Sequence, residues 1–313
     1  MRVEVRQMEE RDLPETDRII RLAFGTFLGI PDPIATFGDS DYAYTRFRAA
    51  PDAAIVAEVD GKLAGSNFAT QWGSFGFFGP LTVDPALWNK GAAQVLLKRT
   101  MELFERWDCR HTGLFTFSNS PKHAALYQKF DYWPQYLTPV MSKDVNSGAT
   151  SHTWLAVSEL RPVQKEQVLA DCRDLTGSIH EGLDLTREIR AVDKQRLGDT
   201  LLMLDGSTVT AFAVCHAGPG TEAGSHACYV KFGAVRPGSS AQANFERLLK
   251  LCESWASTQL AQKLIAGVNM ARHEAYRTMI GLGFRADLIG VALQKGNAQG
   301  FNRPGVYVID DWR

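Results

Sequence analysis

The stretch LTVDPALWNKGAAQVLLK, residues 81–98, is the most informative part of this 313-residue chain. It begins with a short run typical of a strand, which ends at Val83, and Pro85 and a loop of small residues follow. From Ala93 to Phe104 the apolar residues recur at intervals of three and four, which predicts a helix with one apolar face. A strand, a glycine and a helix in this order form an arrangement that can bind an anion.

The start of this predicted helix can hold phosphate oxygens with backbone groups alone. The amides of residues 89–94 have no acceptor inside a helix that begins here, and the helix dipole is positive at this end. Gly91, with the small Ala92 and Ala93 after it, leaves room for a diphosphate to approach closely. Packing and capping also explain a glycine that opens a helix, so the pattern alone leaves both interpretations open.

Strands and helices alternate in the flanking sequence. Residues 2–8 alternate like a strand, and Asp12 and Pro14 then mark a helix start. The glycines and prolines of FGTFLGIPDPIATFGDSD, residues 24–41, predict an irregular loop at the wall of a substrate site. Two strand-like runs meet at Asp60 and Gly61, which suit a tight hairpin turn. Further expected elements are a short helix over 42–48, strands over 74–83, 113–117 and 135–141, and a helix over 121–130.

The second half of the chain repeats this order weakly. A hairpin at Gly206 echoes the one at Gly61, VRPGSSAQANFERLLK (235–250) echoes residues 83–98, and the segment 269–284 echoes 119–132. The separations are nearly equal, which indicates a duplicated domain. The polar segment 142–151 is typical of a linker. We therefore predict an α/β fold with mixed sheets in two tandem domains, residues 1–145 and 153–313.

The composition is that of a soluble globular protein, with 45% hydrophobic and 22% charged residues. Lysine plus arginine (34) nearly balance aspartate plus glutamate (35), so we expect no nucleic-acid partner. No signal-like or membrane-length apolar run occurs, which favours a cytoplasmic location without a membrane partner. The five cysteines are scattered without zinc spacing, so we expect no metal.

Residues 81–98 resemble motif A of the GCN5-related N-acetyltransferase (GNAT) family, in which a strand ending in V-x-P leads to Q/R-x-x-G-x-G/A and a helix. Val83, Pro85, Gly91 and Ala93 match, whereas Trp88 replaces the usual glutamine or arginine beside Lys90. The resemblance extends over residues 2–143, including DGKLAGS upstream and NSPKHAALYQKFDYWPQ downstream. It implies acetyl-CoA as co-substrate, held by Leu81, Val83, Asn89, Lys90, Gly91, Ala92, Ala93, Gln94 and Asn119.

The same resemblance assigns Tyr127 as the general acid that protonates the leaving thiolate. A phenol with a reference pKa of about 10 suits this donation, although a tyrosine at this position also packs well at a helix end. The base is left open, because no carboxylate lies on residues 74–83, where the family often has a glutamate. Glu58, His111 and His123 are candidates by type, each with a packing or surface role as the alternative, and water is another.

An apolar acceptor pocket is expected from four phenylalanines, which otherwise fill the core: Phe27, Phe37, Phe75 and Phe77. In the second half, alignment of the LLK strings places Ala243 opposite Gly91 and the bulky Phe245 opposite Ala93. Met279 stands where the first half has Tyr127. These departures predict a degenerate domain that serves structure, the formation of a homodimer or the shape of the acceptor site.

The leading hypothesis is an acyltransferase that moves an acetyl group from acetyl-CoA to a primary amine by direct attack. The acceptor is a small-molecule amine or a peptide or protein amine, and the sequence does not separate them. The alternative is a non-catalytic acyl-CoA-binding or interaction protein, which Trp88 and Asp131 at motif positions favour. An O-acyltransferase or a longer acyl donor also agrees with motifs that contact only the coenzyme.

Overall fold

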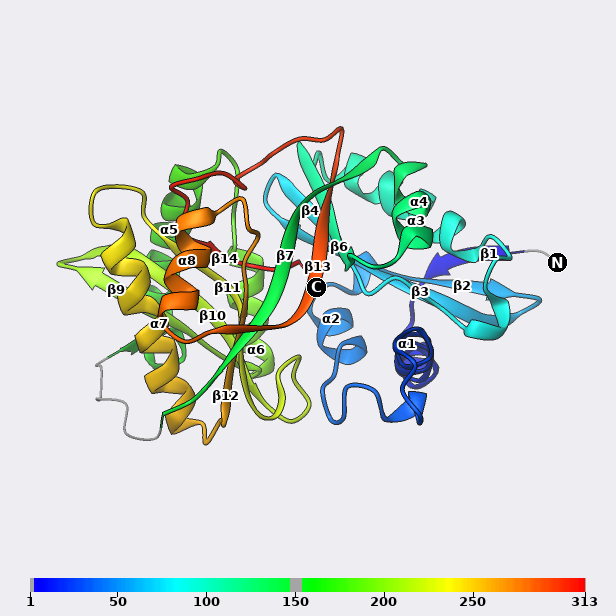
Figure 1. Cartoon of the computed structure of the whole chain (residues 1–313), viewed down its shortest axis with the longest axis horizontal. Helices are drawn as coiled ribbons and strands as arrows, with labels where there is room; N and C mark the ends of the chain where they lie inside the picture. The colour runs from blue at the N-terminus through cyan, green and yellow to red at the C-terminus, as the bar shows by residue number, and fades with distance from the viewer. Residues whose placement is uncertain (1–2, 147–153, 313) are drawn as a thin grey trace.

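The computed structural model describes residues 3–146 and 154–312, in which fourteen strands form a mixed sheet (Figure 1). The first half contains β1 (Val3–Gln7), α1 (Leu13–Leu28), α2 (Ala43–Ala49), β2 (Ala54–Val59), β3 (Lys62–Trp72), β4 (Phe75–Phe78), β5 (Thr82–Val83), α3 (Ala92–Arg106), β6 (His111–Phe117), α4 (Pro121–Gln128) and β7 (Tyr132–Asp144).

The second half repeats this order with strands and helices of similar length. It contains β8 (Leu155–Ala156), α5 (Pro162–Ile179), α6 (Thr186–Gln195), β9 (Gly198–Asp205), β10 (Thr208–Gly218), β11 (Gly224–Val235), α7 (Ala241–Thr258), β12 (Lys263–Gly267), α8 (His273–Gly281), β13 (Arg285–Lys295) and β14 (Val308–Ile309). Single 3-10 turns lie at Glu10–Asp12, Pro33–Ala35, Pro51–Ala53, Pro85–Leu87 and Val157–Glu159. The mixed α/β class that the sequence predicted is confirmed.

The two halves exchange their closing strands. The strand order is β1-β2-β3-β4-β6-β13-β7-β12-β11-β10-β9-β8, so β13 of the second half lies between β6 and β7 of the first. Likewise β7 lies between β12 and β13 of the second half, and all these contacts are antiparallel. Figure 1 shows β7 and β13 crossing the centre of the molecule between the two halves. The repeats are therefore joined by a continuous hydrogen-bonded sheet.

The expected linker is partly strand. β7 continues through Asp144, where Lys143 also forms an ion pair with Glu253 of α7 at 2.8 Å. The rest of the predicted boundary, residues 147–153, lies outside the described residues. The strand extends further than its polar composition suggested because β12 supplies hydrogen-bond partners as far as Asp144.

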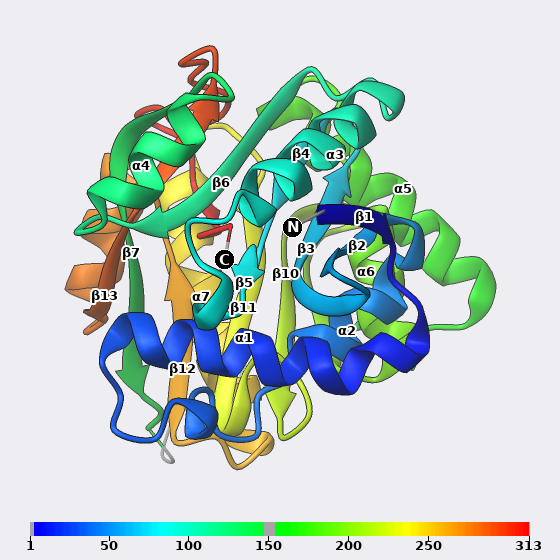
Figure 2. The same cartoon turned by 90° about the vertical axis from the view of Figure 1, so that its right-hand side faces the viewer.

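Helix α1 runs further than expected, into the segment predicted to be irregular. It includes Gly25 and ends at Leu28, where Gly29 adopts the left-handed conformation at φ 68°. A Cβ on Gly25 would lie 2.5 Å from the Cα of Pro33, so the glycine lets the following loop pack against the helix. Figure 2 shows α1 crossing the first half below α3 and α4 in that view.

The sheet opens between β5 and β6. The parallel ladder between β4 and β6 ends at the pair Phe78 and Leu114, and Thr82 and Val83 pair instead with β3. The expected continuous strand over 74–83 is thus broken at Gly79 and Pro80, because proline has no amide N–H to continue a ladder. The edge of β6 beyond Leu114 consequently faces a gap.

Candidate active site

A cavity of about 840 Å³ occupies this gap in the sheet. Its wall combines the inner face of α1, the segment from Phe78 to the start of α3, the end of β6 and the facing side of α4. Two residues of the second half complete it, Leu288 of β13 and Trp312 near the end of the chain. The cavity has a polar end at α3 and an apolar end at α1.

The polar end is formed by the turn that precedes α3. Asn89 and Gly91 have positive φ angles of 65° and 87°, and the helix begins at Ala92. The Gln94 amide donates to the carbonyl of Gly91 at 3.0 Å, so Gln94 is already engaged, contrary to the expectation that its amide lacks an acceptor. Helix geometry leaves the amides of Gly91, Ala92 and Ala93 for an outside acceptor. A Cβ on Gly91 would meet nothing within 4 Å, so this cradle is open.

Lysine side chains flank the turn. Lys90 follows Asn89 directly, and Lys122 of α4 places its Nζ 5.1 Å from the ring centroid of Trp88. The indole N–H of Trp88 donates to the carbonyl of Val83 at 2.8 Å, which fixes the ring. Trp88, which replaces the glutamine or arginine usual at the first position of motif A, therefore stabilises the turn and connects it to Lys122. Sequence reasoning missed Lys122, whose place beside His123 in the segment NSPKHAALY was its only signal.

Most residues predicted to contact the coenzyme line this cavity: Leu81, Val83, Asn89, Lys90, Gly91, Ala92, Ala93 and Gln94. Asn119 does not, because it lies exposed after β6, outside the cavity wall. The neighbouring Ser120 lines the cavity instead and caps α4, accepting a hydrogen bond from the amide of His123 at 3.4 Å. The turn residues are thus brought together as predicted, and Asn119 is not.

Tyr127 of α4 lies in the cavity wall and is buried, with 7% of its surface exposed. Burial raises the pKa of the Tyr127 phenol above its usual value, and a hydrogen bond with the Thr116 side chain opposes this only in part. Its ring packs 5.9 Å from that of Phe78. The phenol therefore keeps its proton at neutral pH, as a proton donor requires.

Of the three candidate bases, only His123 lines the cavity. Burial, with a smaller effect of Lys122, lowers the pKa of the His123 imidazole, so the ring is neutral at neutral pH. Glu58 is instead held by Arg6 at 2.6 Å in an ion pair on β1 and β2. His111 packs against Phe75 at 4.7 Å, and burial lowers its pKa to about 4.

The apolar end contains two of the four predicted phenylalanines. Phe27 packs on Phe117 at 4.8 Å, and Phe37 packs on Phe24 at 5.2 Å. Phe78, the third phenylalanine of the strand that holds Phe75 and Phe77, also lines the cavity. This end is therefore built mainly by α1 and the loop after it.

Phe75 and Phe77 lie outside the cavity wall, which corrects their expected place in an acceptor pocket. They share one face of β4, and that face packs into a core common to both halves with Leu175 and Phe232. Phe77 also stacks on Trp312, with 6.2 Å between ring centroids. Strand alternation turns Phe78 the other way, toward the cavity.

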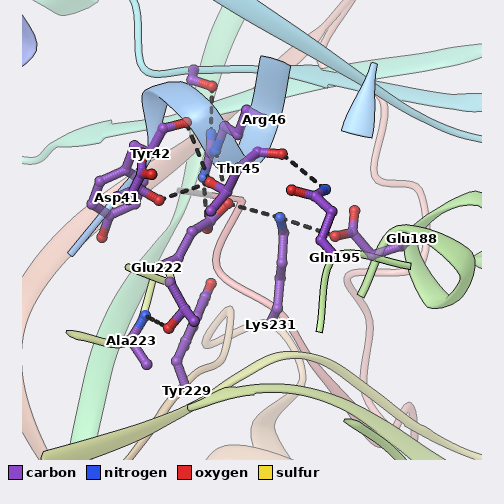
Figure 3. A network of polar contacts seen from close by, with 12 residues as sticks. Asp41, Tyr42, Thr45, Arg46, Glu188, Gln195, Glu222, Ala223, Tyr229 and Lys231 are labelled. Carbon is purple, nitrogen blue, oxygen red and sulfur yellow. Dashed lines mark hydrogen bonds and ion pairs between the residues drawn. The ribbon is translucent and has the colours of Figure 1, made fainter. Parts of the chain in front are cut away.

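A buried ionic network lies behind the cavity (Figure 3). Nε and Nη2 of Arg46 each donate to the Glu222 carboxylate at 3.0 Å, and Lys231 bridges Glu222 (2.9 Å) and Glu188 (3.0 Å). Burial opposes the ionisation of Glu222, but Arg46 and Lys231 outweigh it and keep the pKa of this carboxyl below its usual range. Arg46 also donates to the carbonyl of Gly79 in the cavity wall.

The turn before α7 differs from the one before α3, because its glycine, Gly238, lies three residues before the helix instead of directly before it. Helix α7 begins at Ala241, two residues before Ala243, which the LLK alignment places opposite Gly91. Phe245 is fully buried in the core and packs on Tyr307 at 5.4 Å, so it fills the interior rather than a diphosphate site. Met279 is likewise fully buried.

Comparison with known proteins agrees with this geometry. Residues 18–132 match the model of the acetyltransferase (GNAT) family. Residues 18–132 belong to the GNAT acetyltransferase family. This GNAT match contains the turn before α3, Tyr127 and the apolar end of the cavity. No curated protein sequence matches the chain.

Solved structures extend the GNAT fold to the whole chain. A GCN5-related N-acetyltransferase from Sphaerobacter thermophilus has a TM-score of 0.63 at 14% identity, covering 97% of this chain and 96% of its own. A presumed acetyltransferase from Pyrococcus horikoshii has a TM-score of 0.67 at 13% identity, covering 99% and 95%. A tandem GNAT protein from the clavulanic acid biosynthesis pathway has a TM-score of 0.55 at 11% identity, covering 94% and 98%. At these identities the likeness concerns the fold, which is that of two tandem GNAT domains.

Two further observations concern the described ranges 3–146 and 154–312. No three histidine, cysteine, aspartate or glutamate side chains gather there in a way that could hold a metal ion. No helix in these ranges is long and apolar enough to cross a membrane.

Proposed function

We propose that this GNAT protein binds acetyl-CoA in the cavity of its first half and transfers the acetyl group to a primary amine by direct attack. One observation carries the proposal: an open helix N-terminus with two flanking lysines lies at one end of a cavity whose wall also holds the protonated Tyr127. A diphosphate is an anion that backbone amides and lysines bind well. The open space beside Gly91 fits such a group.

Residues at different places along the cavity have different roles in this reaction. The turn before α3, with Lys90 and Lys122, holds the diphosphate, and the free edge of β6 beyond Leu114 offers backbone groups to the extended arm of the co-substrate. Tyr127 donates its proton to the sulfur as the carbon–sulfur bond breaks and the carbon–nitrogen bond forms. Orientation in the cavity supplies most of the acceleration, with the acid adding to it.

A thiol-release assay tests this function. With acetyl-CoA and a panel of amines, free coenzyme A should appear together with one acetylated amine per thiol. Acetyl-CoA binding in a calorimeter without release by any amine would support a non-catalytic acyl-CoA-binding protein instead. Absence of binding would contradict the proposal altogether.

A further inference from the structure

The apolar part of the cavity wall comes from both halves of the chain. The first half contributes Phe24, Phe27, Phe37 and Phe78, and the second half contributes Leu288 and Trp312. Trp312 reaches the cavity because Gly113 of β6 has no side chain, and a Cβ there would lie 2.1 Å from the indole ring. The wall therefore offers aromatic and aliphatic contacts to an apolar group.

The charges of the cavity wall have one sign. Its charged residues, among the residues that the structure describes, are Lys90, Lys122 and Lys129, and neither aspartate nor glutamate lines it. A protonated amine would find no carboxylate counter-ion among the described residues of the wall. Removing an ammonium from water under these conditions is costly, so the wall selects against an acceptor that arrives charged.

The candidate base that lies at the apolar end, His123, is a weak base. The His123 imidazole packs on Phe27 with 5.0 Å between ring centroids, and its Nδ1 has no hydrogen-bond partner in the described structure. Burial lowers the pKa of this ring. An alkylammonium, like the lysine side chain, has a pKa of about 10 and would not give its proton to such a base.

We infer that the acceptor is an apolar, weakly basic amine of the arylamine class, which enters the cavity already neutral. The inference rests on the proposed function. The lone pair of the neutral nitrogen forms the carbon–nitrogen bond, and the electron pair of the breaking carbon–sulfur bond goes to sulfur, which takes the proton of Tyr127. The attacking nitrogen becomes strongly acidic and gives its extra proton to His123. No ammonium has to be deprotonated before attack.

Two isomeric amines test the inference at pH 7 with acetyl-CoA as donor. p-Toluidine is neutral at this pH, whereas benzylamine has the same atoms but is protonated. We expect kcat/KM for p-toluidine to exceed that for benzylamine at least tenfold, because only about one alkylamine molecule in 10³ is neutral near pH 7.

A carboxylate added at the rim of the cavity should reduce the preference for p-toluidine over benzylamine. Leu28 is 47% exposed in the wall, so Leu28→Glu is tolerated and should lower the KM of benzylamine several-fold. Val163→Glu is the matched control, because Val163 is 83% exposed on α5 outside the cavity and the ratio should not change.

Each other outcome has a defined meaning. Equal or better turnover of benzylamine would overturn the inference and leave the proposed function standing. Acetyl-CoA binding without acetylation of either isomer would overturn the inference as well. If hexanoyl-CoA reacted faster than acetyl-CoA and p-toluidine were inactive, the apolar end would hold the acyl group. This result would also overturn the inference. Failure to bind acetyl-CoA would remove the proposed function, and the inference with it.

Discussion

Arg46 of α2 and Glu222 of the β10–β11 connection form a two-point ion pair across the two halves, with 3.0 Å at each contact. Their side chains are 4% and 0% exposed. Arg46 also holds the carbonyl of Gly79, which lies in the cavity wall. The pair therefore connects the second half to the site of the first.

Glu222→Gln should lower the free energy of unfolding by about 3–5 kcal/mol, because it leaves Arg46 and Lys231 buried with one carboxylate too few. Urea unfolding followed by circular dichroism measures the change. The matched control is Glu102→Gln, which removes an exposed partner of Arg99 and should leave the free energy of unfolding almost unchanged. Equal losses in both variants would contradict the importance of the buried pair.

Gly91→Glu should weaken acetyl-CoA binding at least 10²-fold, because the side chain would enter the open cradle and bring a negative charge to the diphosphate. Isothermal titration calorimetry gives the affinity. Gly61→Glu is the control, since Gly61 also has positive φ (77°) and open surroundings but lies in the β2–β3 hairpin. If both variants bound equally, the diphosphate would have to be placed elsewhere.

Lys122→Met should reduce the affinity for coenzyme A about three- to tenfold and weaken its dependence on salt, since one cation beside the turn is lost. Affinity at two ionic strengths shows both effects. Lys98→Met, at an exposed position of α3 outside the cavity, should change neither. An unchanged salt dependence in Lys122→Met would show that Lys122 does not interact with the bound anion.

Tyr127→Phe should leave acetyl-CoA affinity intact and lower kcat about 10²- to 10⁴-fold, because the ring remains while the proton donor is lost. Pre-steady-state thiol release measures the chemical step. Tyr132→Phe is the control: this buried hydroxyl bonds Thr112 at 2.8 Å outside the cavity wall. Full activity of Tyr127→Phe would return Tyr127 to a packing role.

His216 should make the protein less stable as the pH falls from 6.5 toward 4. It is fully buried, and burial together with Lys231 lowers its pKa from 6.5 to about 4. Below pH 6.5 the unfolded chain takes up a proton that the folded protein does not, so stability is lost, on the order of 3 kcal/mol by pH 4. His216→Leu should reduce the slope of unfolding free energy against pH, by an amount that corresponds to the uptake of up to one proton on unfolding. His273→Leu, at an exposed position, should not.

Local sequence was enough to predict the parts of the site that depend on neighbouring residues. The turn at Asn89–Gly91 and the helix after it follow from a glycine and small residues that open an amphipathic helix, and these residues line the cavity. Tyr127, which the family resemblance assigned, and Phe27 and Phe37, which were chosen as apolar candidates, also line it. Whether they act as proposed is what the variants above measure.

The tertiary structure alone decided which side of a strand faces the cavity and what the second half contributes. Alternation along β4 is visible in the sequence, but not that Phe78 faces the cavity while Phe75 and Phe77 face the second half. The exchange of β7 and β13, which brings Leu288 to the cavity, depends on hydrogen bonds between strands that are about 150 residues apart. Strand partners and buried ion pairs such as Arg46 with Glu222 are chosen by the packing of distant segments, and no local pattern of residues encodes them.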